Sequence, residues 1–161
     1  MPKTQKVSTC LWFDRNAESV VNFYVSLFED SRITSISHYG KGAPMPEGTI
    51  LTVTFDLAGT EFMALNGGPQ FPFTEASSMV VYCDSQVEID RLWSALTADG
   101  GKEVQCGWLK DKFGLSWQIV PARMREMLRD ADQVRLDRVM NEVMKMVKLN
   151  IARLESAYKG E

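Results

Sequence analysis

The feature that most constrains the fold of this chain is an internal repeat of about 70 residues. Phe13-Asp14 and Cys83-Asp84 each stand where a predicted strand ends and a predicted helix begins. After each pair, the predicted order is a helix followed by three strands. Any two amphipathic helices can be aligned by chance, but the same order of five elements occurring twice favours a duplicated βαβββ module.

The first module is predicted from two periodicities. Apolar residues from 17 to 28 recur at the i, i+3, i+4 and i+7 spacing of a helix, whereas residues 50–57 alternate as in a half-buried strand. Ala58-Gly59 can close a tight hairpin after that strand. The predicted elements are a strand at 7–13, a helix at 17–28, a strand at 33–39, a loop at 40–48 and strands at 50–57 and 60–65.

The second module follows a stretch rich in Gly and Pro at 66–72. Ser85 and Glu88 have the spacing of a capping box, which predicts a helix that begins there and runs to about 98. Gly100-Gly101 can supply the left-handed C-terminal cap of this helix. The strands predicted around the helix lie at 78–83, 103–106, 108–110 and 115–120.

The composition changes at Ala122. The last 40 residues contain 5 of the 9 Met residues and have a net charge of +2, whereas the rest of the chain has −5. Apolar residues form one long helical stripe from Leu136 to Val147 and a shorter one from Ile151 to Tyr158. This pattern indicates a pair of helices packed on the sheet or on a partner chain. A Met-rich groove for a ligand is the alternative, because Met adapts to irregular surfaces.

Composition excludes several classes of function. The 161 residues carry a net charge of −3, which argues against a general nucleic-acid binder because such proteins present a basic face. No apolar run is long enough to span a membrane, and no signal-peptide pattern follows Met1. The three cysteines form no CxxC motif, so we expect a reducing, cytoplasmic environment. A single histidine, His38, excludes metal sites rich in His.

Paired βαβββ modules resemble the vicinal-oxygen-chelate superfamily, which includes glyoxalase I, extradiol dioxygenases and bleomycin-resistance proteins. Longer motifs are similar to its PhnB-like branch, whose members are often labelled 3-demethylubiquinone-9 3-methyltransferase. The motifs are Leu11-Trp12-Phe13-Asp14, Asn22-Phe23-Tyr24, the run from Phe62 to Pro69 and the run from Cys106 to Pro121.

This resemblance implies an α+β fold in which two modules, each an open half-barrel, enclose a cavity. The paired βαβββ domain would then span 1–121, with module one at about 5–66, a linker at 67–76 and module two at about 77–121. A helical extension at 122–161 would pack on the same domain or on the partner of a homodimer. Modules of relatives pair within one chain or swap between chains, and the sequence leaves both arrangements open.

The resemblance also implies positions for metal ligands, and the residues there are poor ligands. Hydroxyl groups occupy the starts of the two first strands, at Ser8 or Thr9 and at Ser77 or Ser78. Gln118 stands where metal-binding relatives have Glu. Neutral hydroxyls and amides bind Zn, Fe, Mn and Ni poorly, so we expect no metal and no other cofactor.

Methyl transfer is also not expected. Gly40-Lys41-Gly42 opens no predicted helix, and Gly67-Gly68-Pro69 precedes a strand. A cofactor-binding turn would instead place its glycines between a strand and a helix.

What remains is a predicted cavity with aromatic walls. Trp12, Trp108 and Trp117 lie on or beside predicted strands, and Asn66 and Gln118 lie near the ends of corresponding strands of the two modules. We therefore expect these five residues to bind a small molecule, because apolar walls with a few polar groups suit such ligands. The Trp residues could equally be core or dimer contacts, and Gln118 could face solvent.

The sequence thus favours metal-independent binding of a small amphiphilic or aromatic molecule by a cytoplasmic homodimer. The alternatives are a metal-dependent lyase, isomerase or dioxygenase of the same superfamily, and an interaction protein without a ligand. No catalytic residue can be assigned, and the roles of His38 and Cys106 stay open.

Overall fold

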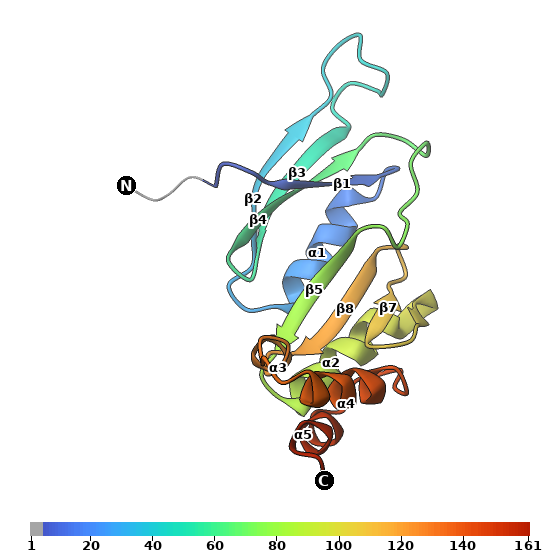
Figure 1. Cartoon of the computed structure of the whole chain (residues 1–161). Coiled ribbons are helices and arrows are strands. Elements are labelled where there is room, and N and C mark those ends of the chain that lie inside the picture. The colour runs from blue at the N-terminus through green and yellow to red at the C-terminus, as the bar shows by residue number, and fades with distance from the viewer. Residues whose placement is uncertain (1–4) are drawn as a thin grey trace. The chain divides into compact units, whose positions relative to one another are not determined.

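The computed structural model describes residues 5–161, which form two compact units divided between Pro72 and Phe73 (Figure 1). Each unit contains one sheet of four strands with helices, so the predicted α+β class and the duplicated module are confirmed. The division falls inside the predicted linker at 67–76.

The first unit is a mixed sheet covered on one face by a helix. Its strand order is β1-β4-β3-β2, with β1 parallel to β4 and the other pairs antiparallel. The buried side chains of α1 and of alternate sheet positions such as Val53 and Phe55 form the core of this unit. The elements are β1 (Thr9–Phe13), α1 (Ala17–Leu27), β2 (Arg32–His38), β3 (Ile50–Leu57) and β4 (Thr60–Asn66).

The second unit repeats this topology. Its strand order is β5-β8-β7-β6, and β5 is parallel to β8 as β1 is to β4. Helix α2 packs on one face through four buried residues, including Leu92 and Trp93. The elements are β5 (Ser78–Cys83), α2 (Gln86–Thr97), the short 3-10 helix η1 (Ala98–Gly100), β6 (Lys102–Glu103), β7 (Trp108–Lys110) and β8 (Ser116–Pro121).

The two ends of α2 differ in how closely they follow the sequence pattern. Ser85 caps the N-terminus, because its hydroxyl accepts a hydrogen bond from Glu88 N. At the other end, Asp99 has the left-handed conformation, with φ 55° and ψ 34°, and Gly100 also has a positive φ of 109°. Gly101 was predicted to contribute to the left-handed cap together with Gly100, but it has φ −64° and is not left-handed. A Cβ there would lie 2.5 Å from the carbonyl oxygen of Leu96, so close packing explains that glycine.

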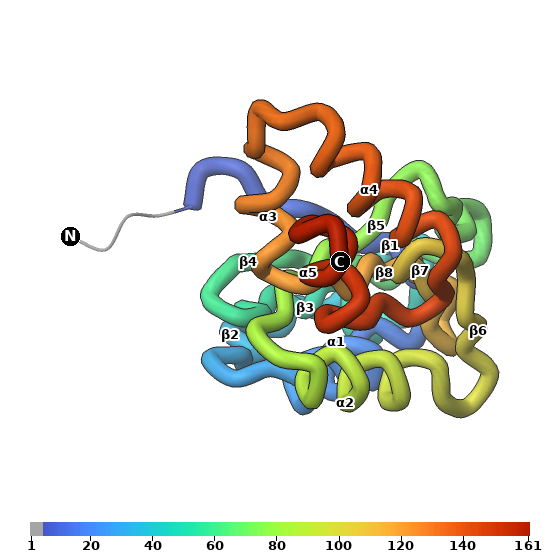
Figure 2. The backbone as a smooth tube through the Cα atoms, turned by 60° about the horizontal axis from the view of Figure 1, so that its bottom comes forward, coloured from blue at the N-terminus to red at the C-terminus, as the bar shows by residue number. Residues whose placement is uncertain are grey.

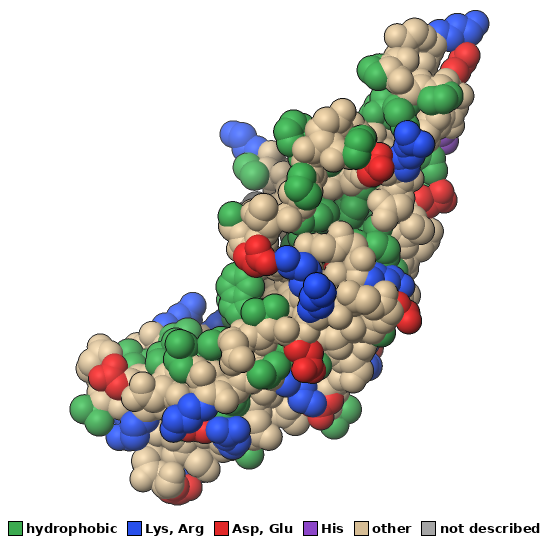
Figure 3. All heavy atoms as spheres, turned by 90° about the vertical axis from the view of Figure 1, so that its right-hand side faces the viewer, with side chains coloured by type: hydrophobic (Ala, Val, Ile, Leu, Met, Phe, Trp, Pro, Cys, Tyr) green, Lys and Arg blue, Asp and Glu red, His purple; other side chains and the backbone are tan. Residues whose placement is uncertain are grey.

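The C-terminal extension packs within the second unit (Figures 1 and 2). It consists of α3 (Met124–Met127), α4 (Gln133–Val143) and α5 (Ile151–Lys159). The predicted apolar stripe to Val147 does not continue as one helix, because α4 ends at Val143. The chain then turns and brings apolar side chains into a second core, formed by Met124, Met127, Val139, Val143, Met146, Leu149 and Leu154. Basic and acidic side chains lie side by side on the outside of this part (Figure 3).

A left-handed pair of residues joins the extension to the sheet. Cys106 and Gly107 have φ values of 62° and 81°. Their backbone N–H groups donate hydrogen bonds to the carbonyl oxygens of Met146 and Val147, at 2.9 and 2.7 Å. The Gly107 carbonyl accepts from Ile119 N of β8 at 2.9 Å. One turn of backbone therefore binds the segment after α4 and the neighbouring strand at the same time.

The side chain of Gln86 provides a second connection to the extension. Its Nε2 donates to the carbonyl oxygen of Leu149 at 3.1 Å, and its Oε1 accepts from Ile151 N at 2.9 Å. Lys148 also forms an ion pair with Asp90, with 2.7 Å between Nζ and Oδ1. These bonds fix the turn between α4 and α5 against α2.

We predict that Gly107→Ala destabilises the second unit much more than Gly114→Ala. Both positions have a positive φ, which costs an L-residue about 1–2 kcal/mol. A Cβ at Gly107 would in addition lie 2.9 Å from the Leu149 side chain, whereas one at Gly114 would meet nothing within 4 Å. Urea unfolding of the two variants measures the difference. Equal losses would show that the contact with Leu149 adds nothing.

Candidate functional site

A pocket of about 350 Å³ lies in the second unit, between one face of the sheet and the C-terminal helices. Residues from β5, β7 and β8 form one wall, and residues from α3, α4 and the turn after α4 form the other. Most of the lining is apolar. The lining residues are Val80, Tyr82, Cys106, Trp108, Gln118, Val120, Met124, Arg125, Leu128, Met140, Val143, Met144 and Leu149.

The sheet wall is built by strand register. Val80 of β5 is paired with Gln118 of β8, and Gln118 is paired with Trp108 of β7. Side chains paired across adjacent strands lie on the same face, so these three form a row across the sheet. The Gln118 Nε2 donates to the Ser78 hydroxyl at 2.9 Å, which orients the amide beside the pocket. The row therefore offers an aliphatic, an amide and an aromatic group to one cavity.

The helix wall is rich in sulfur. Met124, Met140 and Met144 line the pocket, and the Cys106 thiol contacts Met144 with 3.6 Å between the two sulfur atoms. Unbranched thioether side chains adapt to ligands of irregular shape. This arrangement gives the predicted Met-rich extension a place at a cavity in addition to its role in the core.

Arg125 supplies the only charged side chain among the lining residues. Its guanidinium carbon lies 3.4 Å from the centre of the Tyr82 ring, which is a close cation–π contact. The aromatic ring of β5 thereby holds a cation of α3 at the rim of the pocket.

Trp117, a predicted site residue next to Gln118, lies on the other face of the sheet and is fully buried. Its indole Nε1 donates to Asp111 Oδ2 at 2.9 Å. The other carboxylate oxygen of Asp111 accepts from the backbone N–H groups of Phe113 and Leu115. Trp117 thus fastens the turn that precedes β8.

Trp12, another predicted site residue, lies in the first unit and contacts the linker. Its Nε1 donates to the carbonyl oxygen of Gly68 at 2.8 Å, and its ring meets Phe71 edge-on, with 4.9 Å between ring centres. A Cβ at Gly67 would lie 2.3 Å from the Trp12 ring, so this glycine is required by the close approach of the indole.

Asn66, also in the first unit, is only 3% exposed. Its Oδ1 accepts from Ala17 N at 2.9 Å, and its Nδ2 donates to the carbonyl oxygen of Ile50 at 3.1 Å. Asn16 stands at the N-cap position of α1 but makes no side-chain cap bond. Asn66 therefore caps α1 from the neighbouring strand.

Of the five predicted site residues, the structure brings Trp108 and Gln118 together in one pocket. Sequence reasoning missed Tyr82 and Arg125. The alternation of residues 78–83 places Tyr82 on the same face of β5 as Val80, so that signal was present. The position of Arg125 depends on α3, a helix of four residues that no periodicity indicated.

The positions at which the resemblance implies metal ligands do not fit a metal here. The Ser8 hydroxyl donates to the Glu61 carbonyl, and the Ser78 hydroxyl is bonded to Gln118. Within residues 5–161, no three His, Cys, Asp or Glu side chains lie close enough together to hold a metal ion. We derive no chemistry through a metal, because the donors present are neutral hydroxyls and an amide.

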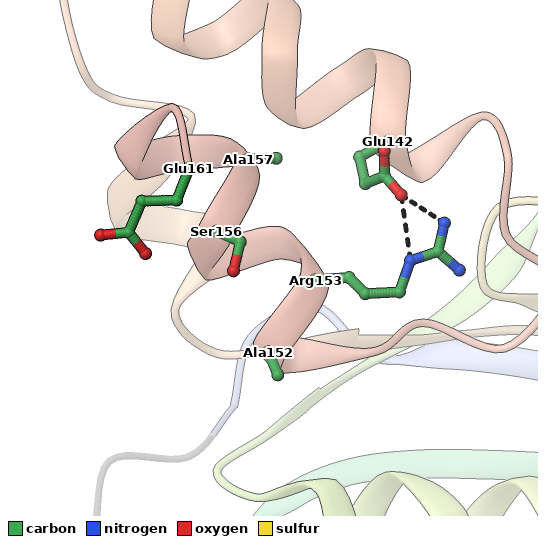
Figure 4. A pocket seen from close by; sticks show the side chains of 6 residues that line it. All are labelled: Glu142, Ala152, Arg153, Ser156, Ala157 and Glu161. Atoms are coloured by element: carbon green, nitrogen blue, oxygen red, sulfur yellow. Dashed lines mark hydrogen bonds and ion pairs between the residues drawn. The ribbon is translucent and has the colours of Figure 1, made fainter.

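A second, more open hollow of about 330 Å³ lies between α4 and α5 (Figure 4). Arg153 reaches from α5 to Glu142 of α4, with its Nε 3.0 Å from Oε1, and its Nη2 also contacts that oxygen. Lys145 pairs with the same carboxylate at 3.2 Å. These cations hold the pKa of Glu142 below its usual range. The ion pair between Arg153 and Glu142 joins α5 to α4. We therefore assign these charged side chains to the packing of the two helices and not to a binding site.

The three cysteines are free thiols. Burial, and then the nearby carboxylates of Glu88 and Asp84, raise the pKa of Cys83 to about 12. Cys83 is therefore an inert core residue, because a thiol reacts as its thiolate. Cys106, in contrast, lines the pocket.

No helix in the described part of the chain is long and apolar enough to cross a membrane.

The two mixed sheets, each a βαβββ module, define the class of this protein as an α+β protein with the glyoxalase/bleomycin-resistance fold. The chain belongs to the PhnB-like family described as 3-demethylubiquinone-9 3-methyltransferase, whose sequence model matches residues 5–120. The predicted family is thereby confirmed.

Solved structures agree with this assignment. A PhnB protein from Bacillus cereus, provisionally described as a 3-demethylubiquinone-9 3-methyltransferase, is 41% identical over 73% of this chain and 100% of its own, with a TM-score of 0.67. A Pseudomonas aeruginosa protein is 21% identical over 71% of this chain and 95% of its own, with a TM-score of 0.57, and shows the fold alone. None of the curated proteins matches.

The family match ends before the extension begins. Seven of the thirteen residues that line the pocket, from Met124 onward, lie beyond residue 120. The sheet wall of the pocket therefore belongs to the matched region, and the whole helix wall lies outside it.

We predict that Asn66→Ala destabilises the protein by about 1–3 kcal/mol, because it leaves Ala17 N and the Ile50 carbonyl without their partner in a buried place. Asn16→Ala is the matched control, since this N-cap residue makes no side-chain cap bond, and should change stability little. Urea unfolding followed by circular dichroism measures both. A stable Asn66→Ala protein would contradict the capping role.

Proposed function

We propose that this protein binds a small amphiphilic or aromatic molecule, without a metal, in the pocket between the sheet and the C-terminal helices. The observation that carries the proposal is a gathering of exposed apolar side chains at a cavity. Five large exposed hydrophobic residues line it: Val80, Tyr82, Leu128, Met140 and Met144. Soluble proteins seldom expose clustered apolar surface unless it binds something.

The few polar groups of the pocket support the same proposal. Gln118 offers an amide, Cys106 a thiol and Arg125 a cation, while the remaining lining is mainly aliphatic and aromatic. Small-molecule sites commonly combine apolar walls with a small number of placed polar groups. Trp108 adds an indole on which a flat ring can pack. We therefore expect the ligand to have an apolar body and at least one polar end.

Methyl transfer is not part of this proposal, although the family carries that description. Gly40 and Gly42 lie in the loop between β2 and β3, and Gly67 and Gly68 lie before the turn that leads to β5. Neither pair opens a helix, which is where a cofactor-binding glycine turn is expected. The neutral donors at the positions where the superfamily resemblance implies metal ligands likewise give no support to metal-dependent catalysis.

We also propose that the protein is a cytoplasmic homodimer. The resemblance, which implies a homodimer, supports the dimer, and the free thiols of Cys10, Cys83 and Cys106 suit a reducing compartment. Native mass spectrometry is expected to give twice the mass of the 18.2 kDa chain. A monomer mass at micromolar concentration would overturn this proposal.

We predict that the uncharged dye N-phenyl-1-naphthylamine binds in the pocket with a rise in fluorescence, and that Met144→Glu weakens this binding about tenfold or more. A carboxylate in an apolar site must lose water when the dye enters, and this cost is about 1.4 kcal/mol or more. The matched control is Val134→Glu, because Val134 is 63% exposed, Met144 is 65% exposed, and Val134 does not line the pocket.

Melting curves of both variants check that the fold is intact. Dye binding that both variants keep would place the dye elsewhere, and dye binding absent from the wild type would overturn the proposed function.

A further inference from the structure

We infer that the ligand of this pocket carries one anionic group, a carboxylate or similar oxyanion, and that Arg125 binds it. The inference rests on the proposed function and names the chemical class of the molecule bound. It starts from the charge of the pocket. Arg125 is the only cation among the lining residues, and neither Asp nor Glu lines the described pocket.

Four other arginines of the extension already use their guanidinium groups in ion pairs or hydrogen bonds within the protein. Arg123 pairs with Glu126 and Glu155, Arg135 pairs with Asp130, and Arg153 pairs with Glu142. Arg138 donates to the carbonyl oxygens of Ala157 and Tyr158. Within residues 5–161, Arg125 forms no ion pair and no side-chain hydrogen bond. The guanidinium instead makes a cation–π contact with the face of the Tyr82 ring.

This contact leaves the binding edge of Arg125 available. A guanidinium group stacks through its flat face, whereas its N–H donors point outward in its own plane. Tyr82 lies 3.4 Å from the guanidinium carbon, so stacking fixes the group without using those donors. A planar carboxylate can then accept two parallel hydrogen bonds from the same edge.

The apolar groups next to Arg125 determine the rest of the ligand. Leu128 lies one turn further along the chain, and Met140 and Met144 line the same pocket. An anionic end at Arg125 would therefore leave the body of the ligand against thioether and aliphatic groups, with Trp108 and Gln118 on the sheet wall. The pocket suits a small aromatic or aliphatic acid better than a neutral hydrocarbon or a cation.

Two dyes that differ mainly in one charge test this inference. 8-Anilinonaphthalene-1-sulfonate has the skeleton of N-phenyl-1-naphthylamine with an added sulfonate, which stands in for the anionic end. Fluorescence titration of the full-length protein should show that Arg125→Gln weakens binding of the sulfonate dye about tenfold, the effect of losing about 1.4 kcal/mol. The uncharged dye should bind this variant as it binds the wild type.

Arg129→Gln is the matched control, because it removes the same charge from a neighbouring exposed position that does not line the pocket. It should leave the affinities for both dyes unchanged. Loss of sulfonate binding in Arg125→Gln alone supports the inference. The inference would be overturned if Arg125→Gln bound the sulfonate dye as tightly as the wild type does. It would also be overturned if Arg125→Gln and Arg129→Gln lost the same amount of affinity for that dye. In either case the proposed function would still stand if the wild type bound the uncharged dye and Met144→Glu weakened that binding. The inference and the proposed function would both fail if the wild type bound neither dye.

Discussion

Two backbone hydrogen bonds, from the N–H groups of Cys106 and Gly107 to the carbonyl oxygens of Met146 and Val147, hold the extension against the sheet. Both residues have the left-handed backbone, which glycine adopts without strain at 107 but which is uncommon for a residue such as Cys106. The turn after α4 is fixed there, and Met146 and Leu149 enter the second core because of it. The part of the helix wall that follows α4 therefore depends on this junction, whereas Arg125 is placed by α3, which follows β8 directly and packs against it.

The sequence predicted most of the fold because local signals and the tertiary structure agree. Alternation in 50–57, the hairpin at Ala58-Gly59 and the cap at Ser85 each mark an element that the structure contains. Helix α3 was not foreseen, because four residues are too few to show a periodicity. The end of α4 was placed too late, because the apolar stripe continues into a turn whose side chains pack in the same core.

The candidate site was less predictable, since polarity and residue type do not show what a side chain contacts. Trp117 and Gln118 are neighbours on one strand and must face opposite sides of the sheet, so only one of them can line a given pocket. Gln118 does so, and Trp117 is bonded to Asp111. The amide of Asn66 is used by the backbone of α1 and β3, a contact between residues 49 and 16 positions apart in the chain that no local pattern records.

The boundary of the family match at residue 120 divides the pocket: the sheet wall lies inside the matched region and the helix wall outside it. Substitutions in α3 and α4 can change the chemistry of one wall without altering any strand of the duplicated modules. For the proposed ligand site, a relative that shares the sheet but has a different C-terminal segment would present a different wall to the ligand, so overall identity would be a poor guide to a shared ligand.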